Sequence, residues 1–460
     1  MNQRPNILYV FTDQQSADAM SCAGNPDLHT PAMDSLAASG VRFGRAYCTY
    51  PLCTPARASM FTGRMPHEVG IDRNNVPIEE RFRQEELGHL LSAAGYECVY
   101  GGKWHVPEIS IPEGHGFRSI CPFDDVALPH RCREFLEGPH HRPFFLVASF
   151  DNPHNICEWR RQQNVPWGSI GEPPKVEDCP MLPANFAIPP FEPEAIRIIT
   201  TSNRRMYPGP NYSDDQWRRY RWAYFRLVEK VDAQIGQILD ALRDTGLADN
   251  TLVIFSSDHG DGNSSHHLVQ KSFLYEEAMR VPMIVSMPGV TGRGRVDDAH
   301  LISANLDFYT TVCDFSGVEP PAGLKGRSLR PLLDGSDGVD WRDHLVAETH
   351  FGSHRCDGRM VRTDRYKYVA YTWGAYREQL FDMERDPGEM VNLAVRSTYR
   401  DILQQHRDLL RAWCERTSDG FYGGHYSHRD VPFMVPGDEY PQSVEEIPDE
   451  TGPSAPDLCN

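Results

Sequence analysis

Residues 53–64 read CTPARASMFTGR, and this stretch is the most specific local signal in the chain. Pro55 favours a helix that starts here, which places Cys53 just before the amino terminus of that helix. Free backbone N–H groups and the helix dipole favour an anion or a nucleophile at that point. Arg57, about one turn further on, can reach back to it. Because a cysteine in front of a helix is more often structural than catalytic, the interpretation depends on the rest of the chain.

Short apolar runs rich in β-branched and aromatic residues alternate with helical patterns on both sides of this stretch. The alternation is typical of a parallel sheet with crossover helices, so the predicted fold class is α/β. The predicted strands are residues 7–11, 96–100, 144–150, 252–256 and 283–286. The predicted helices are residues 31–39, with Thr30 as amino-terminal cap and Gly40 past the end, 85–94, and 214–244.

The pattern changes near residue 339, which predicts a larger domain over residues 1–340 and a smaller carboxy-terminal domain over 341–460. The smaller domain is predicted to hold antiparallel strands at 360–363, 366–371 and 379–381, a helix at 399–416, and a tail after Tyr426 that lies on the surface or frays. Residues 155–211 are rich in proline and lack periodicity. They predict a long irregular segment that shapes a binding site or is mobile.

The composition excludes several functional classes. The 460 residues contain 46 Lys and Arg against 64 Asp and Glu, which gives a formal net charge of −18. An anionic surface cannot release counterions from nucleic acid, and acidic lipid repels it. Hydrophobic residues make up 40%, the mean hydropathy is −0.52, and no apolar run approaches the roughly 20 residues of a membrane span. We therefore expect no nucleic-acid partner and no membrane partner.

The first residues and the cysteines bear on the cellular compartment. The apolar run at 7–11 is far too short for the core of a signal peptide. Twelve cysteines are scattered from Cys22 to Cys459 without a CxxC pair, which favours a reducing compartment. We expect a cytoplasmic protein, or a periplasmic or secreted one if the sequence was trimmed at its start.

Charged and imidazole side chains directly follow four of the predicted strands. The carboxyl ends of parallel strands form the ligand crevice of an open α/β sheet, so these side chains are expected to converge. They are Asp13 after the first strand, Lys103 and His105 after the second, His154 after the third, and Asp258 and His259 after the fourth. A single aspartate would be interpreted as part of a surface loop, but four such strand ends favour a shared site.

The stretch at 53–57, together with other segments in the same order, resembles the type I sulfatase family. The matching segments are 6–14, 101–105, 153–154, 257–261, Lys271 with 275–276 and 280–282, 359–368 and 380–393. The resemblance implies an alkaline-phosphatase-like fold, in which helices sandwich a mixed, largely parallel sheet and a smaller carboxy-terminal α+β domain follows a catalytic domain. It also implies that Cys53 is oxidised to formylglycine, by a formylglycine-generating or an anaerobic sulfatase-maturating enzyme.

The resemblance implies one divalent metal ion, held by Asp13, Gln14, residue 53, Asp258 and His259. Carboxylate, amide and imidazole donors at these positions suit such an ion, which would polarise an oxygen of the substrate. Many sulfatases have aspartate where Gln14 stands and asparagine where His259 stands. Calcium is the expectation from the family, while imidazole favours Mn²⁺ or Zn²⁺ over Ca²⁺, so the metal stays open.

The resemblance also assigns catalytic roles. Asp258 would deprotonate a hydroxyl of the hydrated aldehyde at position 53, and Arg57 would hold that group. The sulfate oxygens would be bound by Lys103, His154 and Lys271, and one of the last two would protonate the leaving oxygen. His105 would take a proton from the second hydroxyl, so that sulfate leaves and the aldehyde re-forms.

The substrate is expected to be a small sulfated compound, with a sulfated saccharide favoured because amide, imidazole and aromatic side chains suit a sugar ring. The candidate substrate contacts outside the catalytic set are Asn74, Asn75, Asn155, Glu158, His266, His267, Trp373 and Tyr376, each of which is more often a surface or packing residue. Two alternatives stay open: a phosphonate monoester or phosphodiester hydrolase on the same scaffold, and a binding protein without activity. The oligomeric state is also open.

Overall fold

A computed structural model describes residues 4–202, 212–335, 338–352 and 356–422 of the chain. The predicted tail after Tyr426 lies outside these residues. The centre of the fold is an eight-stranded sheet in the order β5, β4, β6, β1, β7, β8, β2, β9. These strands are β5 (Arg118–Cys121), β4 (Glu97–Gly102), β6 (Phe144–Pro153), β1 (Asn6–Asp13), β7 (Thr251–Ser257), β8 (Met283–Ser286), β2 (Val41–Phe43) and β9 (Arg295–Asp297).

The sheet is mixed and largely parallel. The run from β5 to β7 is parallel, whereas β8 pairs antiparallel with both β7 and β2. Every residue of β1 and β6 is buried, as expected for central strands that are covered on both faces. Tyr9 lies opposite Val147 of β6 and Ile254 of β7, so the carboxyl ends of the three strands reach the same edge. The predicted α/β class and mixed sheet are confirmed.

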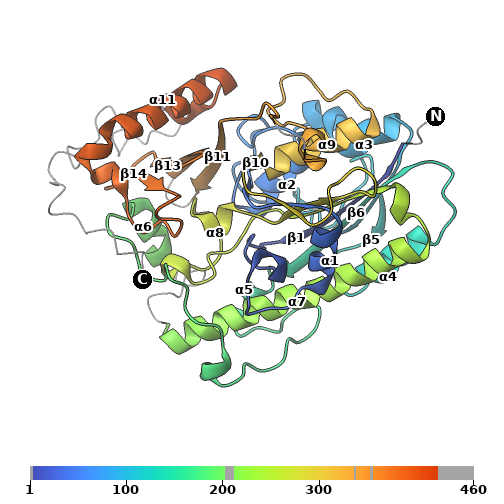
Figure 1. Ribbon diagram of the computed structural model, residues 1–460, viewed down its shortest axis with the longest axis horizontal. Coiled ribbons are helices and arrows are strands. Elements are labelled where there is room, and N and C mark those ends of the chain that lie inside the picture. Colours follow the sequence, from blue (N-terminus) through green and yellow to red (C-terminus); the bar gives the residue numbers. More distant parts are fainter. Residues whose placement is uncertain (1–3, 203–211, 336–337, 353–355, 423–460) are drawn as a thin grey trace.

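Helices cover both faces of the sheet (Figure 1). On one face lie α1 (Pro31–Ser39), α4 (Leu128–Leu136) and the long α7 (Asp214–Asp244), and on the other lie α2 (Cys53–Thr62), α3 (Leu87–Ala93) and α9 (Ala304–Ser316). Helix α7 begins with a capping box between Ser213 and Gln216. The shorter elements are β3 (Ala46–Tyr47), β10 (Ile302–Ser303), α5 (Ile156–Arg160), α6 (Glu194–Ser202), α8 (Glu276–Met279) and α10 (Arg330–Leu333).

The amino-terminal cap of α1 differs from the prediction. Thr30 occupies the cap position, but its hydroxyl accepts from the backbone N–H of Ser21 and donates to the Asp34 carboxylate, and it accepts from no backbone N–H of the described helix. The carboxylate of Asp232, on α7, accepts instead from the N–H groups of Ala32 and Met33, at 3.1 and 2.9 Å. A neighbouring helix therefore satisfies the free donors of α1.

The carboxy-terminal part forms a second sheet of four antiparallel strands, β11 (His344–Phe351), β12 (Cys356–Thr363), β13 (Tyr366–Tyr371) and β14 (Glu378–Asp382), beside helix α11 (Arg400–Thr417). The predicted smaller α+β part is confirmed, while β11 was not predicted. Ala347 of β11 and Met360 of β12 belong to the same apolar core as the large sheet. The domain boundary at 340 stays a prediction.

The segment 155–211 is less irregular than predicted, because its described residues contain the helices α5 and α6. Within the described part of the chain, no helix is both long and apolar enough to span a membrane.

Candidate active site

Cys53 is the first residue of α2, one position further into the helix than predicted. All ten residues of α2 are buried, and the Cys53 side chain is fully enclosed. The N–H of Thr54 donates to the amide oxygen of Asn74 at 3.0 Å, which fixes the start of the helix. The helix thus presents residue 53 at the edge where β1, β6 and β7 end.

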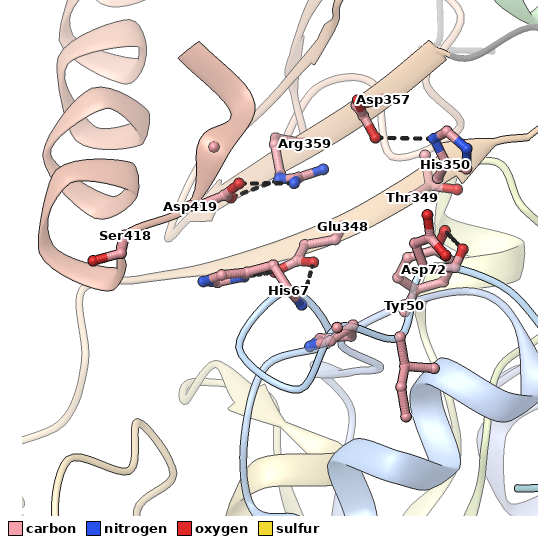
Figure 2. Close-up of a pocket in the computed structure, with 14 residues that line it drawn as sticks. Tyr50, His67, Asp72, Glu348, Thr349, His350, Asp357, Arg359, Ser418 and Asp419 are labelled. Atoms are coloured by element: carbon pink, nitrogen blue, oxygen red, sulfur yellow. Dashed lines mark hydrogen bonds and ion pairs between the residues drawn. The ribbon is translucent and has the colours of Figure 1, made fainter. Parts of the chain in front are cut away.

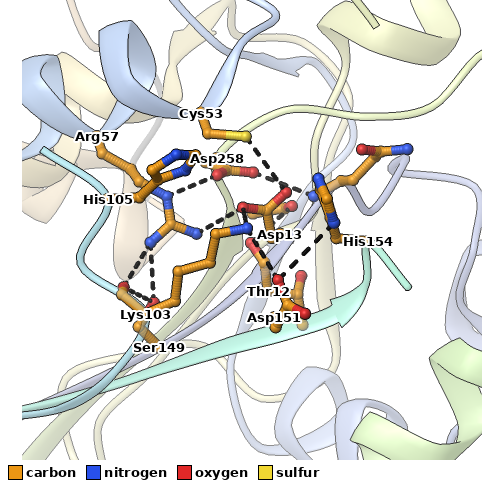
Figure 3. A network of polar contacts seen from close by, with 12 residues as sticks. Thr12, Asp13, Cys53, Arg57, Lys103, His105, Ser149, Asp151, His154 and Asp258 are labelled. Atoms are coloured by element: carbon orange, nitrogen blue, oxygen red, sulfur yellow. Dashed lines mark hydrogen bonds and ion pairs between the residues drawn. The ribbon is translucent and has the colours of Figure 1, made fainter. Parts of the chain in front are cut away.

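Arg57, one turn into α2, connects the two aspartates at that edge (Figure 3). Its Nη2 donates to Asp13 Oδ2 at 2.9 Å and its Nε to Asp258 Oδ2 at 2.8 Å. Its Nη1 donates to the carbonyl oxygen of Lys103 at 2.6 Å and to Ser149 Oγ at 3.1 Å. The guanidinium therefore connects the ends of β1, β4 and β7 with Ser149 of β6, while the predicted reach of Arg57 back to residue 53 stays a prediction.

Lys103 follows β4 and is buried between two carboxylates. Its Nζ lies 2.8 Å from Asp13 Oδ2 and 2.8 Å from Asp151 Oδ1. Gly102 permits this placement, because it has φ +92° and a Cβ there would lie 1.9 Å from the carbonyl oxygen of Ser149. The ammonium therefore points into the same edge as Cys53.

The Cys53 sulfur lies among cationic and imidazole groups. Lys271 Nζ donates to it at 3.0 Å and His259 Nε2 lies 3.3 Å away. Burial and Asp13 raise the pKa of the Cys53 thiol, but Lys271, His259 and Lys103 outweigh them and hold it well below its usual range. The environment stabilises negative charge at residue 53, as the site of an anionic substrate requires.

The pKa values of His154, Asp258 and Asp13 are shifted in different directions. Burial, with Lys103 and Lys271, lowers the pKa of His154 to about 3, so its imidazole is neutral near pH 7. Burial and the neighbouring Asp13 raise the pKa of Asp258 to about 6. Burial also opposes ionisation of Asp13, but Lys103 and Lys271 outweigh it and hold the pKa of Asp13 well below its usual range.

Four predicted metal ligands lie together. The ligand atoms of Asp13, Cys53, Asp258 and His259 are all within 4.8 Å of one another, and all four residues are buried. Two carboxylates beside an imidazole fit a divalent cation, and a buried anionic pair of this kind needs positive charge nearby. The predicted donor set therefore suits the implied metal, and its identity stays open.

His105 follows Lys103 and is placed against α2. The hydroxyl of Thr54 donates to the carbonyl oxygen of His105 at 2.7 Å. The ring nitrogen Nδ1 of His105 is buried and has no hydrogen-bond partner within the described ranges. Such a nitrogen is available to a group bound at residue 53.

Comparison with known proteins identifies the family. The sulfatase family profile matches residues 5–318, and the profile described as N-sulphoglucosamine sulphohydrolase, C-terminal, matches residues 264–415. The chain belongs to the sulfatase family. The predicted resemblance is thereby confirmed, and the protein is a sulfuric ester hydrolase.

Similar sulfatases cover almost the whole chain. The delta 4,5-hexuronate-2-O-sulfatase of Bacteroides thetaiotaomicron is 33% identical over 450 residues, covering 91% of this chain and 90% of that protein. A solved structure of a putative sulfatase from the same organism has a TM-score of 0.83 at 31% identity and covers 99% of each chain. A solved structure described as a 2-O GAG sulfatase has a TM-score of 0.82 at 30% identity, again over 99% of each chain.

Two predicted substrate contacts of this sulfatase have structural partners. Asn74 caps α2, as described above, and Asn155 Nδ2 donates to Asp151 Oδ2 at 2.5 Å. Contact of either side chain with substrate stays a prediction. The side-chain amide of Gln14 donates to Asp261 Oδ2 at 2.6 Å, while its backbone N–H donates to Asp258.

The remaining candidates for substrate contact lie in other surroundings. His266 stacks on Tyr275 with ring centroids 4.0 Å apart, and His267 packs on Phe186 at the same distance. Tyr376 packs edge-on against Phe191 at 5.2 Å. The other candidates are Asn75, with its N–H 3.4 Å from the Thr54 hydroxyl, Glu158, in an ion pair with Arg161, and Trp373, packed against the large core.

Three buried residues of the sulfatase site were missed by the sequence patterns: Ser149, Asp151 and Asp261. Asp151 accepts from Lys103, from Asn155 and, at 3.2 Å, from Nε1 of Trp167. It lies at the carboxyl end of β6, three residues before His154, so the strand-end rule applied to it as well. The strand-end rule does not select Ser149 or Asp261. Their place in the site comes from contacts with distant side chains, Arg57 for Ser149 and Gln14 for Asp261.

A second polar cluster lies between the loop after α2 and the carboxy-terminal sheet, around a cavity of about 220 Å³ (Figure 2). The ligand atoms of His67, Glu348 and Asp419 lie within 4.8 Å of one another. The imidazole of His67 pairs with Glu348, and Arg359 donates to both oxygens of Asp419 at 2.7 and 2.8 Å. Because protein donors already occupy these carboxylates, the cluster is an ion-pair network that joins the loop after α2 to the carboxy-terminal sheet.

Proposed function

We propose that this sulfatase hydrolyses a sulfate ester on a carbohydrate, through residue 53 as nucleophile and with one divalent metal ion. The observation that carries the proposal is the convergence of Lys103, Lys271 and Arg57 on the buried edge around residue 53. Three cationic side chains there balance three carboxylates, so an added divalent cation leaves net positive charge for a sulfate monoester.

The choice of a carbohydrate rests on the relatives. A relative that is 33% identical to this chain is a hexuronate-2-O-sulfatase, and a solved relative is described as a 2-O GAG sulfatase. A 2-O-sulfated hexuronate is therefore the first substrate to test. Gln14 and His259 also occur in the donor sets of related phosphonate and phosphate diester hydrolases, so those esters form the alternative.

The metal ion, when bound by Asp13, Asp258, His259 and the amide oxygen of Gln14, would withdraw electron density from a sulfate oxygen. A formylglycine derived from Cys53 would supply, as its hydrate, a hydroxyl nucleophile and a second hydroxyl for release of sulfate. These two groups supply the chemistry that the unmodified side chains lack.

The chain's own residues bind the anion and move protons. The ammonium groups of Lys103 and Lys271 bind sulfate oxygens, because each lies within 4 Å of the Asp13 carboxylate at the same edge. An oxygen of the Asp258 carboxylate accepts the nucleophile's proton. The unpartnered ring nitrogen of His105 accepts the second proton. His154 or Lys271 donates to the leaving oxygen.

The decisive experiment combines the mass of the peptide that contains residue 53 with the rate of sulfate release. Conversion of Cys53 to formylglycine lowers the mass of the peptide containing residue 53 by about 18 Da. Converted protein should release sulfate from a 2-O-sulfated hexuronate, and Cys53→Ala should release none while its melting temperature changes little, because the thiol is small. Substantial turnover by Cys53→Ala would contradict the nucleophile, and faster turnover of aryl phosphonates than of sulfate esters would favour the alternative.

A further inference from the structure

The side chain of Gln14 has an unusual partner for a metal ligand. Its Nε2 donates to Asp261 Oδ2 at 2.6 Å, and both side chains are fully buried. Asp261 lies two residues after His259, outside the group of ligand atoms that surround the metal position. A carboxylate that is not among these ligand atoms therefore binds the amide group.

The carboxylate of Asp261 is held as an acceptor by three donors besides Gln14. The hydroxyl of Tyr220 lies 2.9 and 3.1 Å from its two oxygens. The backbone N–H of Asn263 donates to Oδ1 at 2.7 Å, and the backbone N–H of Gln270 donates to Oδ2 at 3.1 Å. The backbone N–H of Asp261 itself donates to the hydroxyl of Ser16. Since every neighbour donates, the oxygen of the Gln14 amide cannot face Asp261, and only its NH₂ group can.

The backbone of Gln14 is fixed as well. Its φ is +72°, in the left-handed region, and its N–H donates to Asp258 Oδ1 at 3.1 Å. The hydroxyl of Tyr224 donates to its carbonyl oxygen at 2.8 Å. With the backbone and Nε2 both fixed, Oε1 is the remaining polar atom, and within the described part of the chain its hydrogen-bond neighbour is the Cys157 sulfur, 4.0 Å away.

We propose that Asp261 is a positioning residue of the metal centre, which orients the Gln14 carboxamide so that Oε1 is presented to the cation. The inference rests on the divalent metal of the proposed function. It assigns the two residues one joint role: Gln14 contributes a neutral oxygen ligand, and Asp261 contributes the negative charge from behind. Partners of this kind hold metal ligands in the binding geometry.

The pairing is reciprocal, and this makes it testable. Gln14→Glu would place two carboxylates at the 2.6 Å contact, so the new carboxylate would turn away or lose its charge. Asp261→Asn removes the charge and offers an NH₂ group where Gln14 needs an acceptor. Gln14→Glu combined with Asp261→Asn restores one donor and one acceptor, with their positions exchanged.

The experiment measures binding of Ca²⁺ and of Mn²⁺ by titration calorimetry on the full chain after removal of metal, with circular dichroism as the check of folding. We expect each single substitution to weaken binding by about 10–100-fold, and the double variant to bind within a few-fold of the unmutated protein. Asp232→Asn is the matched control. Asp232 is also buried and its carboxylate also accepts from two backbone N–H groups, but Asp232 lies on α7 and its donors lie on α1. This substitution should lower the melting temperature and leave cation binding unchanged.

Three outcomes would overturn the proposal. The first is binding by Asp261→Asn within twofold of the unmutated protein, and the second is a double variant that binds no better than Gln14→Glu. If Asp261→Asn fails to fold, the comparison of Gln14→Glu with the double variant decides, because rescue of both folding and binding is then the expected result. The third is absence of any cation binding by the unmutated protein, which alone would also remove the metal from the proposed function.

Discussion

Arg57 and Asp258 are joined by a fully buried ion pair, with Nε 2.8 Å from Oδ2 and neither side chain exposed. The same guanidinium bonds to Asp13 through Nη2. One side chain on the helix that carries residue 53 therefore fixes the carboxylates of two different strands. The geometry of the metal position depends on this single planar group, because it sets the separation of the two carboxylates.

Arg57→Lys should disable the site even though it keeps the charge. One ammonium cannot donate in the plane of both carboxylates and also reach Ser149, so buried acceptors lose their partners. We expect the rate with an aryl sulfate to fall by at least about 100-fold, and the free energy of unfolding to fall by on the order of 2–4 kcal/mol. Kinetics and urea denaturation measure the two effects.

Arg64→Lys is the control for this substitution, since Arg64 is partly exposed and its guanidinium pairs with Glu85 at 2.6 Å. It should change both quantities little. Equal behaviour of the two variants would contradict the role given to Arg57.

Asp151→Asn should weaken substrate binding more than it slows turnover. Asp151 accepts from Lys103, Asn155 and Trp167, and an amide would turn its own NH₂ toward one of these donors. Lys103 then loses the contact that aims its ammonium at the sulfate, and we expect KM to rise by about 10-fold. Trp167→Phe, which removes one donor and keeps the ring, should raise KM less. An unchanged KM in Asp151→Asn, together with unchanged inhibition by free sulfate, would show that Lys103 needs no such partner.

His154→Ala should reveal which group donates a proton to the leaving oxygen. A neutral imidazole, as the pKa of about 3 requires, can still donate its ring N–H to that oxygen. Loss of this donor should slow esters of sugar alcohols more than nitrophenyl sulfate, whose leaving oxygen needs no proton. The measurement is the slope of log kcat against the pKa of the leaving group, compared with Lys271→Ala. Slopes that match the unmutated enzyme in both variants would assign the proton to water or to another residue.

His67 should make stability depend on pH. Burial alone would lower the pKa of His67, but Glu348 and Asp419 outweigh it and raise it to about 9, from an ordinary value of 6.5. The charged pair stabilises the fold fully below pH 6.5, and this contribution, on the order of 3 kcal/mol, is lost as the pH rises through about 9. Melting temperatures of the unmutated protein and of His67→Gln should therefore converge between pH 6 and pH 9.5. A constant difference over that range would contradict the raised pKa.

The sequence predicted those strands and site residues that a local pattern identifies, namely apolar runs and the polar side chains that follow them. Asp13 and Asp258 follow apolar runs directly, so the strand-end rule located them. Helix α9 was missed because all but one of its thirteen residues are buried, which leaves no polar face and no helical period to detect. The contact between Asn74 and Thr54 joins residues that are 20 positions apart, and the cap that Asp232 supplies to α1 comes from 200 residues away. Such contacts depend on tertiary packing and leave no local pattern.

The position of β1 in the sheet has a consequence for how the chain reaches its folded state. Both neighbours of β1 come later in the sequence, and β7 begins at Thr251. At about 5–20 residues per second, a ribosome therefore needs roughly 12–50 s before the first strand can complete its pairing. Helix α2 packs on α9, which is synthesised later still, at Ala304–Ser316. In the folded structure the Cys53 side chain is fully enclosed, so the proposed conversion of Cys53 would have to take place before these helices pack.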